Sequence, residues 1–299
     1  MKKGLLVTLI IISTIVVSSC NSPEGIGKFV FNMSNIDHSS YHIYMMDENG
    51  ANLIQITEGT IFSADSYPSF SPDGRTILFN TFRDNNLDIY VINTDGTDEK
   101  QLTNHKGYDG HPAWSPDGKK VIFVSSRDVN NDDKKPLYIM NSDGSEQIRF
   151  LNIEASILCP QWSPDGEKIA FHSKINGKFD IYTINIDGTD WVNLTDNLPS
   201  IDCYCPRYSP DGMYIVFESG EKEIYIMDFD GSDQQKLITN SHTAISPTWS
   251  PDGQQIAFIS NINTEEDEGS EIYKMNIDGS NRVLLLSTNK TIQWIDWSY

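Results

Sequence analysis

Short apolar runs, each closed by a turn signal, recur from residue 27 to the end of the chain. One type of run ends in Phe, as in "TILF", "KIAF" and "QIAF", and places Phe79, Phe123, Phe171, Phe217 and Phe258 at equivalent positions. A second type, as in "DIYVINTDG", carries a Tyr before a turn of the NxDG or DxxG kind, at Tyr44, Tyr90, Tyr138, Tyr182, Tyr225 and Tyr273. The runs have the length of strands and lack helical periodicity, so they predict an all-β protein.

The first type of run follows a recurring corner, an aromatic residue and then Ser-Pro-Asp-Gly. Its Ser, or the matching Ser at the end of the chain, stands at positions 71, 115, 163, 209, 250 and 298. The intervals are therefore 44, 48, 46, 41 and 48 residues, and each holds four short strands and two turn signals. A repeat of this size and content is typical of one blade of a β-propeller.

The two ends of the repeat region complement each other. The stretch "GKFVFNMS" matches the strand after a corner, with Phe31 in the place of Phe79, whereas "IQWIDWSY" matches the strand before a corner, with Trp297 in the place of Trp114. We therefore predict a six-bladed β-propeller with four-stranded blades, in which the N- and C-terminal strands share one blade and close the ring.

The corners themselves follow turn chemistry. Pro suits the first central position of a type I turn, Asp tolerates the next, and Gly takes the left-handed position that feeds the following strand. We interpret the corner aspartates, such as Asp117 and Asp165, as turn residues and not as cation ligands.

The first 26 residues are expected to lie outside the propeller. "MKKG" is a short positive segment, "LLVTLIIISTIVV" is apolar but short for a membrane span, and "VSSC" resembles the lipobox of bacterial lipoproteins. The resemblance implies a signal peptide over residues 1–19 and lipid on Cys20 within a tether over residues 20–26. The repeats place the propeller over residues 27–299. An uncleaved anchor and an ordinary signal peptide are the alternatives. All three place the domain outside the cytoplasm, and lipidation implies a cell membrane or outer membrane, facing the periplasm or the exterior.

Composition indicates a globular, strongly acidic protein. The chain is 38% hydrophobic and 21% charged, and 22 basic against 42 acidic residues give a formal charge of -20. Phosphate recognition depends on Lys and Arg, so we expect no nucleic-acid partner.

The repeats resemble those of TolB-type propellers, also found in relatives of dipeptidyl peptidase IV and prolyl oligopeptidase and in oligogalacturonate lyase. "WSPDGKKVIFVSSRD", "WSPDGEKIAFHSK" and "DIYVINTDGTDEKQLT" carry the resemblance, which extends over residues 27–299. TolB itself has an α/β domain before its propeller, and we expect no counterpart here. Gly-x-Ser-x-Gly, HExxH, phosphate-loop and Cys-x-x-Cys motifs are absent from the sequence. We therefore expect a non-catalytic protein without a cofactor.

One ring of positions is the candidate binding site. Both tight corners of each repeat must share one face, because the strands run up and down, so the variable loops lie on the opposite face. Three residues before each motif aromatic, and expected around the channel on this loop face, stand Tyr67, His111, Cys159, Cys205, Ser246 and Trp294, of which all but Trp294 precede Pro. The alternative is that these residues only pack at the starts of strands.

Thiols add two further expectations. His111, Cys159, Cys203 and Cys205 could hold a soft metal, but their spacing matches no zinc pattern, so we expect none. If two of the three thiols besides Cys20 form a disulfide, Cys159 and Cys205 are the better placed, since they occupy matching positions on adjacent blades.

These features together predict a lipid-anchored propeller of the cell envelope that binds a protein or glycan partner on its loop face and meets the membrane only through its lipid. The alternative is a metal-dependent polysaccharide lyase similar to oligogalacturonate lyase. That enzyme would need a His-rich channel site, for which only His111 and His242 are suitably placed, and the negative charge would repel a polyanionic substrate.

Overall fold

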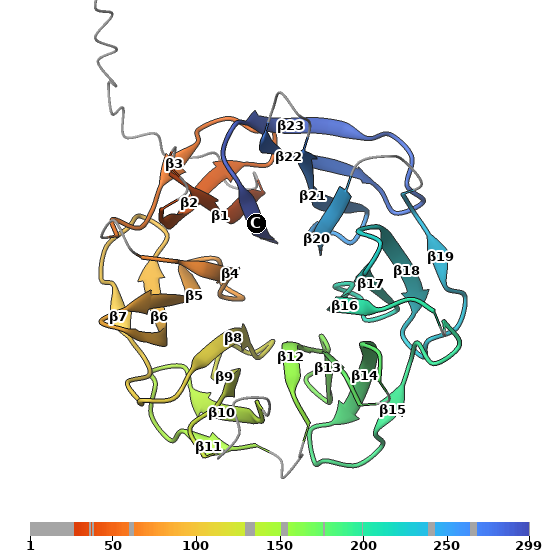
Figure 1. Cartoon of the computed structure of the whole chain (residues 1–299), viewed down its shortest axis with the longest axis horizontal. Coiled ribbons are helices and arrows are strands. Elements are labelled where there is room, and N and C mark those ends of the chain that lie inside the picture. Colours follow the sequence, from red (N-terminus) through yellow and green to blue (C-terminus); the bar gives the residue numbers. More distant parts are fainter. Residues whose placement is uncertain are drawn as a thin grey trace, which may run out of the picture.

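The computed structural model describes residues 27–298, apart from 36, 38, 60–62, 129–134, 151–154, 176, 199, 239–242 and 264–267. Over this part the chain forms six separate antiparallel sheets, each of four strands, arranged in a ring (Figure 1). The six-bladed, all-β prediction is confirmed.

Each blade is one sheet with its strands in order from the channel outward. The first blade holds β24 (Ile292–Ser298), β1 (Lys28–Ser34), β2 (Tyr41–Asp47) and β3 (Ile54–Gln55). The second holds β4 (Ser66–Phe70), β5 (Thr76–Arg83), β6 (Asn86–Asn93) and β7 (Lys100–Gln101). The third holds β8 (Asp109–Trp114), β9 (Lys120–Ser125), β10 (Leu137–Asn141) and β11 (Ile148–Arg149).

The remaining blades follow the same order. The fourth holds β12 (Ile157–Trp162), β13 (Lys168–Ser173), β14 (Asp180–Asn185) and β15 (Val192–Asn193). The fifth holds β16 (Cys203–Tyr208), β17 (Tyr214–Ser219), β18 (Ile224–Asp228) and β19 (Gln235–Lys236). The sixth holds β20 (Thr243–Trp249), β21 (Gln255–Asn263), β22 (Glu268–Asn276) and β23 (Val283–Thr288).

The ring closes in the first blade, as the sequence predicts. β24, from the end of the chain, pairs antiparallel with β1, and the register sets Phe29 opposite Trp297. Figure 1 shows the C-terminal strand beside β1 on the inner side of that blade. Closure leaves β1 paired on both sides, so this blade has the same four-stranded form as the others.

The core consists of side chains packed between neighbouring blades. The strand-ending Phe of every repeat is almost completely buried, namely Phe31, Phe79, Phe123, Phe171, Phe217 and Phe258. In the first blade, Phe29, Phe31 and Trp297 pack with Ala257 and Ile259 of the sixth blade. The hydrophobic core is therefore continuous across the closing joint.

The corners have the predicted turn geometry. In the first complete corner, Ser71 Oγ donates to Asp73 Oδ1 at 2.6 Å and accepts from the backbone N–H of Thr76 at 3.0 Å. Gly74 has a φ of 68°, which a residue with a side chain rarely adopts. Equivalent hydrogen bonds from Ser115 and the backbone of Lys119 lower the pKa of Asp117 to about 2. The corner carboxylates thus accept hydrogen bonds within their own turns.

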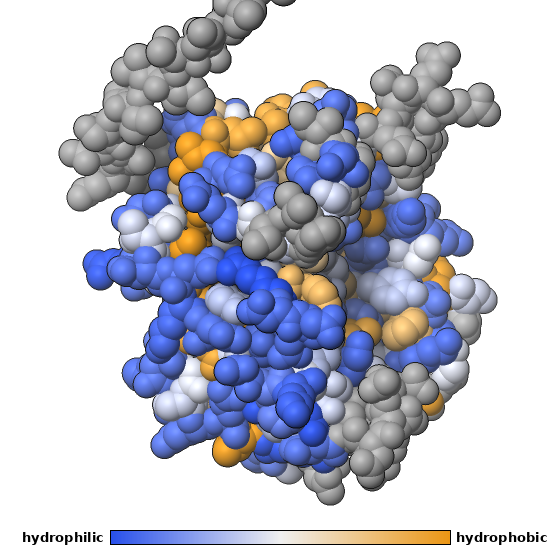
Figure 2. Space-filling model, turned by 60° about the vertical axis from the view of Figure 1, so that its left-hand side comes forward, coloured by the Kyte–Doolittle hydropathy of each residue, from blue (hydrophilic) through white to orange (hydrophobic). Residues whose placement is uncertain are grey.

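Strand direction separates two faces. Within every complete blade the Ser-Pro-Asp-Gly corner joins the first and second strands, and the Asp-Gly turn joins the third and fourth. Antiparallel pairing places both turns on one face, called here the corner face, and the remaining connections on the loop face. The side of the molecule shown in Figure 2 is mostly hydrophilic, with apolar side chains in small patches, in keeping with the acidic composition.

The predicted signal peptide, Cys20 and the tether lie outside the described residues, as does His242. Within the described part of the chain, no helix has the length and apolar character needed to cross a bilayer.

Candidate functional site: the loop-face mouth of the channel

The six ring positions lie on the innermost strands, where a β-bulge or similar irregularity interrupts the pairing with the second strand in every blade. At five of these positions the residue before Pro also has a φ between 48° and 53°, namely at Tyr67, His111, Cys159, Cys205 and Ser246. A left-handed backbone at a non-Gly residue is uncommon and costs on the order of 1 kcal/mol or more. Trp294, which no Pro follows, is not among the residues with positive φ.

Polar side chains on the second strand of the blades stabilise this irregular backbone. The backbone N–H groups of His111, Cys205 and Ser246 donate to Asn80 Oδ1 (3.1 Å), His172 Nδ1 (3.2 Å) and Glu218 Oε2 (3.1 Å), respectively. The N–H of Trp294 donates to Asn32 Oδ1 at 2.9 Å. These four N–H groups, which would otherwise be buried without a partner, are thereby satisfied.

The supporting residues were not among the positions expected from the sequence. Asn32, Asn80, His172 and Glu218 all directly follow the strand-ending Phe of their repeat. In the other two repeats that position is Val124 or Ile259. A polar residue in four of six copies, within an otherwise apolar strand, was the available signal.

Three aromatic rings form one side of the mouth. Tyr67 stacks on Trp294, with ring centroids 3.9 Å apart and an interplanar angle of 26°. On its other side it contacts the His111 ring, at 4.0 Å. Burial raises the pKa of the Tyr67 hydroxyl above its ordinary value, so this group stays protonated. The stack is an aromatic wall with polar tips.

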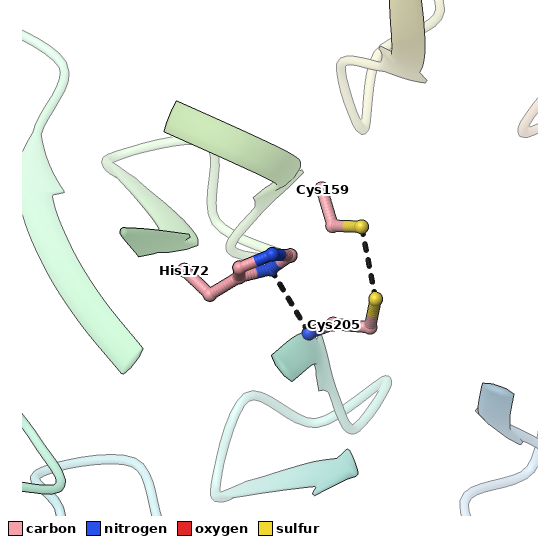
Figure 3. A group of neighbouring side chains, drawn as sticks. All are labelled: Cys159, His172 and Cys205. Atoms are coloured by element: carbon pink, nitrogen blue, oxygen red, sulfur yellow. Dashed lines mark hydrogen bonds between the residues drawn. The ribbon is translucent and has the colours of Figure 1, made fainter. Parts of the chain in front are cut away.

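Two thiols form the opposite side. Cys159 Sγ and Cys205 Sγ lie 2.9 Å apart as free thiols (Figure 3). Cys159 Sγ also lies 3.5 Å from His111 Nδ1. Burial alone would raise the pKa of the Cys159 thiol, but the hydrogen bond from Cys205 lowers it well below its ordinary value. Sharing that hydrogen bond raises the pKa of Cys205, and burial adds to the effect.

Cys203, which the sequence placed among the possible ligands, belongs elsewhere. Its side chain is buried in a separate cluster with Ile215 and Phe217, and its thiol donates to the carbonyl of Ile201 at 3.6 Å. Burial raises its pKa to about 11. Among the described residues, His172 and not Cys203 joins Cys159 and Cys205.

Glu218 adds an acid to the mouth. Burial raises its pKa to about 7, although the hydrogen bond from the Ser246 N–H opposes the shift. The group can therefore exchange a proton near neutral pH.

A pocket with about 500 Å³ of open space occupies the loop face above these residues. Tyr67, His111, Cys159, Cys205 and Trp294 line it, and the same five side chains also line a smaller cavity further along the channel. Ser246 is buried beside them and contributes to neither lining; its hydroxyl accepts from the backbone N–H of Ile295 at 3.3 Å. Five of the six ring side chains thus line both spaces along the channel.

A second, larger pocket with about 820 Å³ of open space lies on the corner face. Its wall contains motif aromatics and prolines from several blades, including Trp162, Trp249 and Trp297, together with Arg207 and Asp296. Its repeating lining follows directly from the corner motif, whereas the loop-face pocket is lined by residues that differ from blade to blade.

The fold and the mouth define a repeat-built six-bladed propeller with a pocket at the loop-face end of its channel. Residues 129–298 match the family model described as the TolB beta propeller domain, more than half of the chain. The protein therefore belongs to the TolB β-propeller family.

Similarity to individual relatives covers less of the chain. The Tol-Pal system protein TolB of Thioalkalivibrio sulfidiphilus is 35% identical over 72 residues, 23% of this chain and 16% of the relative. That of Hahella chejuensis is 36% identical over 78 residues, 25% of this chain and 17% of the relative. The matched segments thus span about one sixth of the length of these relatives.

Solved structures share the fold at low identity. TolB from Acinetobacter baumannii has a TM-score of 0.76 at 21% identity, covering 92% of this chain and 68% of the other. Hydrazine synthase of Kuenenia stuttgartiensis has a TM-score of 0.75 at 15% identity, covering 91% of this chain and 46% of the other. Oligogalacturonate lyase in complex with manganese has a TM-score of 0.58 at 17% identity, covering 86% of this chain and 73% of the other. One architecture thus serves quite different proteins, so these similarities concern the fold alone.

Proposed function

We propose that this protein is a non-catalytic binding module of the bacterial cell envelope that docks a protein partner on the loop-face mouth. The observation that carries the proposal is the pocket in which the rigid stack of Tyr67, His111 and Trp294 meets the thiol pair. Rigid aromatic side chains with polar tips lose little conformational entropy on binding and are enriched at interaction hot spots.

The relatives support a protein as the partner. Several are named components of the Tol-Pal system, which makes a protein-binding role the natural starting hypothesis for this propeller. The acidic chain further favours a partner with a neutral or basic contact surface. A glycan is the alternative partner.

The mouth can be tested with two tyrosines from one strand. Tyr204 and Tyr208 stand at opposite parts of β16; both are half-buried, but Tyr204 lines the loop-face pocket and Tyr208 the corner-face pocket. At either position, a photo-cross-linking phenylalanine analogue replaces a tyrosine side chain of similar shape. In living cells we expect a protein adduct from position 204 and none from position 208. Adducts from position 208 alone would place the partner on the corner face and overturn the proposal.

We further propose that lipid on Cys20 holds the module at a membrane, because the lipobox-like "VSSC" follows a short apolar segment with a positive start. Cys20→Ala should abolish incorporation of labelled fatty acid and move the protein into the aqueous phase of a detergent phase separation. Cys203→Ala, which removes a thiol within the propeller, is the matched control and should still be lipidated. Unchanged labelling of the Cys20 variant would refute the anchor.

The lyase alternative has fold similarity in its favour, through the manganese-bound oligogalacturonate lyase. Against it, the candidate metal-binding group found among the described residues contains one His and two Cys, a donor set that does not suit manganese. Incubating the purified protein with oligogalacturonate and Mn²⁺ should yield no unsaturated product. Formation of such a product would replace the binding proposal.

A further inference from the structure

Three potential metal ligands meet at the mouth, from two adjacent blades. Cys159 lies on β12, His172 on β13 of the same blade, and Cys205 on β16 of the next. One ligand atom from each lies within 4.8 Å of the other two (Figure 3). No two of these residues are closer than 13 positions in the sequence, so linear spacing does not reveal the group.

The distances suit a small tetrahedral ion. Zinc bound at about 2.3 Å to sulfur and about 2.0 Å to nitrogen holds its ligand atoms roughly 3.3–3.8 Å apart. The two sulfurs, now 2.9 Å apart, would need to separate by less than about 1 Å, and the imidazole would need to move by a similar amount.

The surroundings favour an ion over an apolar packing role. Cys159 is half-buried and lines the loop-face pocket, which gives an ion a route of entry. Two thiolates balance the charge of one divalent cation, so occupancy leaves no net charge at a largely desolvated position.

The backbone already orients the ligands. His172 Nδ1 accepts from the N–H of Cys205 at 3.2 Å, and His111 Nδ1 accepts from the N–H of Cys159 at 3.3 Å. Each imidazole thereby lies against the backbone of a cysteine of the following blade. Coordination of zinc by either ring nitrogen of neutral His172 replaces the hydrogen bond from the Cys205 N–H, because Nδ1 then either binds the ion or carries the proton. The left-handed φ of Cys159 and of Cys205, 48° and 49°, turns both side chains toward each other across the blade junction.

We propose that Cys159, Cys205 and His172 form a zinc site with three protein ligands. Its fourth position faces the loop-face pocket, where a water molecule or a group from a ligand completes the tetrahedron. Each thiol that is protonated in the free protein releases its proton to solvent when zinc binds. His111 contacts Cys159 Sγ and acts as a positioning residue. This inference does not depend on a protein partner at the mouth.

Cobalt(II) provides a direct test, because its thiolate complexes absorb in the near ultraviolet and its tetrahedral complexes absorb in the visible. The full chain is purified in detergent without a metal-binding tag, reduced with a phosphine, freed of metal and titrated with Co²⁺. We expect both absorptions to saturate at one equivalent and to disappear when Zn²⁺ is added. Zinc should also raise the melting temperature.

Variants identify the ligands. Cys159→Ser and Cys205→Ser should each lose about half of the thiolate absorption. His172→Gln should weaken Co²⁺ binding at least about 10-fold, because loss of a residue that only hydrogen-bonds to a metal ligand already has an effect of that size. Cys203→Ser, in the nearby third thiol, is the matched control and should titrate like the parent. Circular dichroism of each variant verifies that it is folded.

Two outcomes would overturn the proposal. One is the absence of thiolate-to-cobalt absorption in the reduced parent protein. If the isolated chain carries a Cys159–Cys205 disulfide and still binds no metal after reduction, the two cysteines serve as a cross-link and not as ligands. The other is an unchanged cobalt spectrum in the Cys159→Ser/Cys205→Ser double variant, which would place the ion elsewhere.

Discussion

The rings of Phe29 and Trp297 lie 4.4 Å apart, although the two residues stand near opposite ends of the described chain. They face each other across the β1–β24 pair, and Trp297 is only 6% exposed. Their contact joins the two ends of the chain within one blade, so the stability of the whole ring depends on a strand contributed by the last residues.

We therefore expect Trp297→Ala to lower the free energy of unfolding by about 3–5 kcal/mol, the usual effect of truncating a buried aromatic side chain. Urea denaturation measures the change. Phe229→Ala is the control, because Phe229 is 48% exposed and its loss should change stability by no more than about 0.5 kcal/mol. Equal urea midpoints for the parent and Trp297→Ala would show that the closing strand does not stabilise the ring.

Asp296 ties the same strand to the blade on each side. Its Oδ2 accepts from the backbone N–H of Phe70 at 2.9 Å, and its Oδ1 accepts from the Thr248 hydroxyl at 3.3 Å. Asp296→Ala leaves both donors without this partner, so we expect a loss of about 1–3 kcal/mol in unfolding free energy. Glu221→Ala, which removes an exposed carboxylate, is the control and should have little effect on the unfolding free energy. An equal loss in both variants would show that the two hydrogen bonds of Asp296 do not stabilise the closing strand.

Glu218 predicts a pH dependence of stability. Its folded-state pKa is about 7 against an ordinary value of 4.5, so between these values the folded protein binds more protons than the unfolded chain. Stability contributed by this group is therefore present below pH 4.5 and is lost as the pH rises to 7, by about 3 kcal/mol at most.

Glu218→Gln removes this titration while keeping an oxygen that can accept from the Ser246 N–H. We expect the variant to have a flatter stability profile between pH 4.5 and 7 and to exceed the parent in stability above pH 7. Urea midpoints of metal-free protein across this range measure both effects. Parallel profiles for parent and variant would show that Glu218 titrates near its ordinary pKa.

Substituting Tyr67, His111 and Trp294 together by Ala should weaken partner binding by more than about 2 kcal/mol, or roughly 30-fold in affinity. The partner is the protein recovered from the position-204 cross-link, and binding is measured by calorimetry. Asp117→Asn with Asp165→Asn on the corner face is the control and should bind like the parent. Loss of binding in the control alone would move the site to the opposite face.

Much of the candidate site could be located from the repeats. Aligning the corners places Tyr67, His111, Cys159, Cys205, Ser246 and Trp294 at one level of the channel, and the structure indeed gathers five of them around one pocket. The repeats predict these positions because every blade places the third residue before the motif aromatic at the same level of its inner strand.

The alignment failed where side-chain direction departs from strand alternation. Residues two apart in a strand normally share a face, so alternation alone would place the Cys203 and Cys205 side chains together. The left-handed backbone at Cys205 and the adjacent bulge turn its thiol toward Cys159, while Cys203 stays in the core between blades. His172 and Glu218 were missed because their role is to satisfy the N–H of a bulge in the next blade, a contact that exists only once blades pack.

The sequence by itself determined the number of blades, the four strands in each, the corner turns and the shared closing blade. These features follow from local rules, namely apolar runs of strand length and turn residues at a fixed interval, which act on short segments. Only the tertiary structure decided which side chains meet at the mouth. The Tyr67–Trp294 stack and the Cys159–Cys205 contact each join neighbouring blades, and bulges with left-handed residues set the direction of their side chains. Contacts of this kind depend on how separate sheets pack around the axis, which no local pattern encodes.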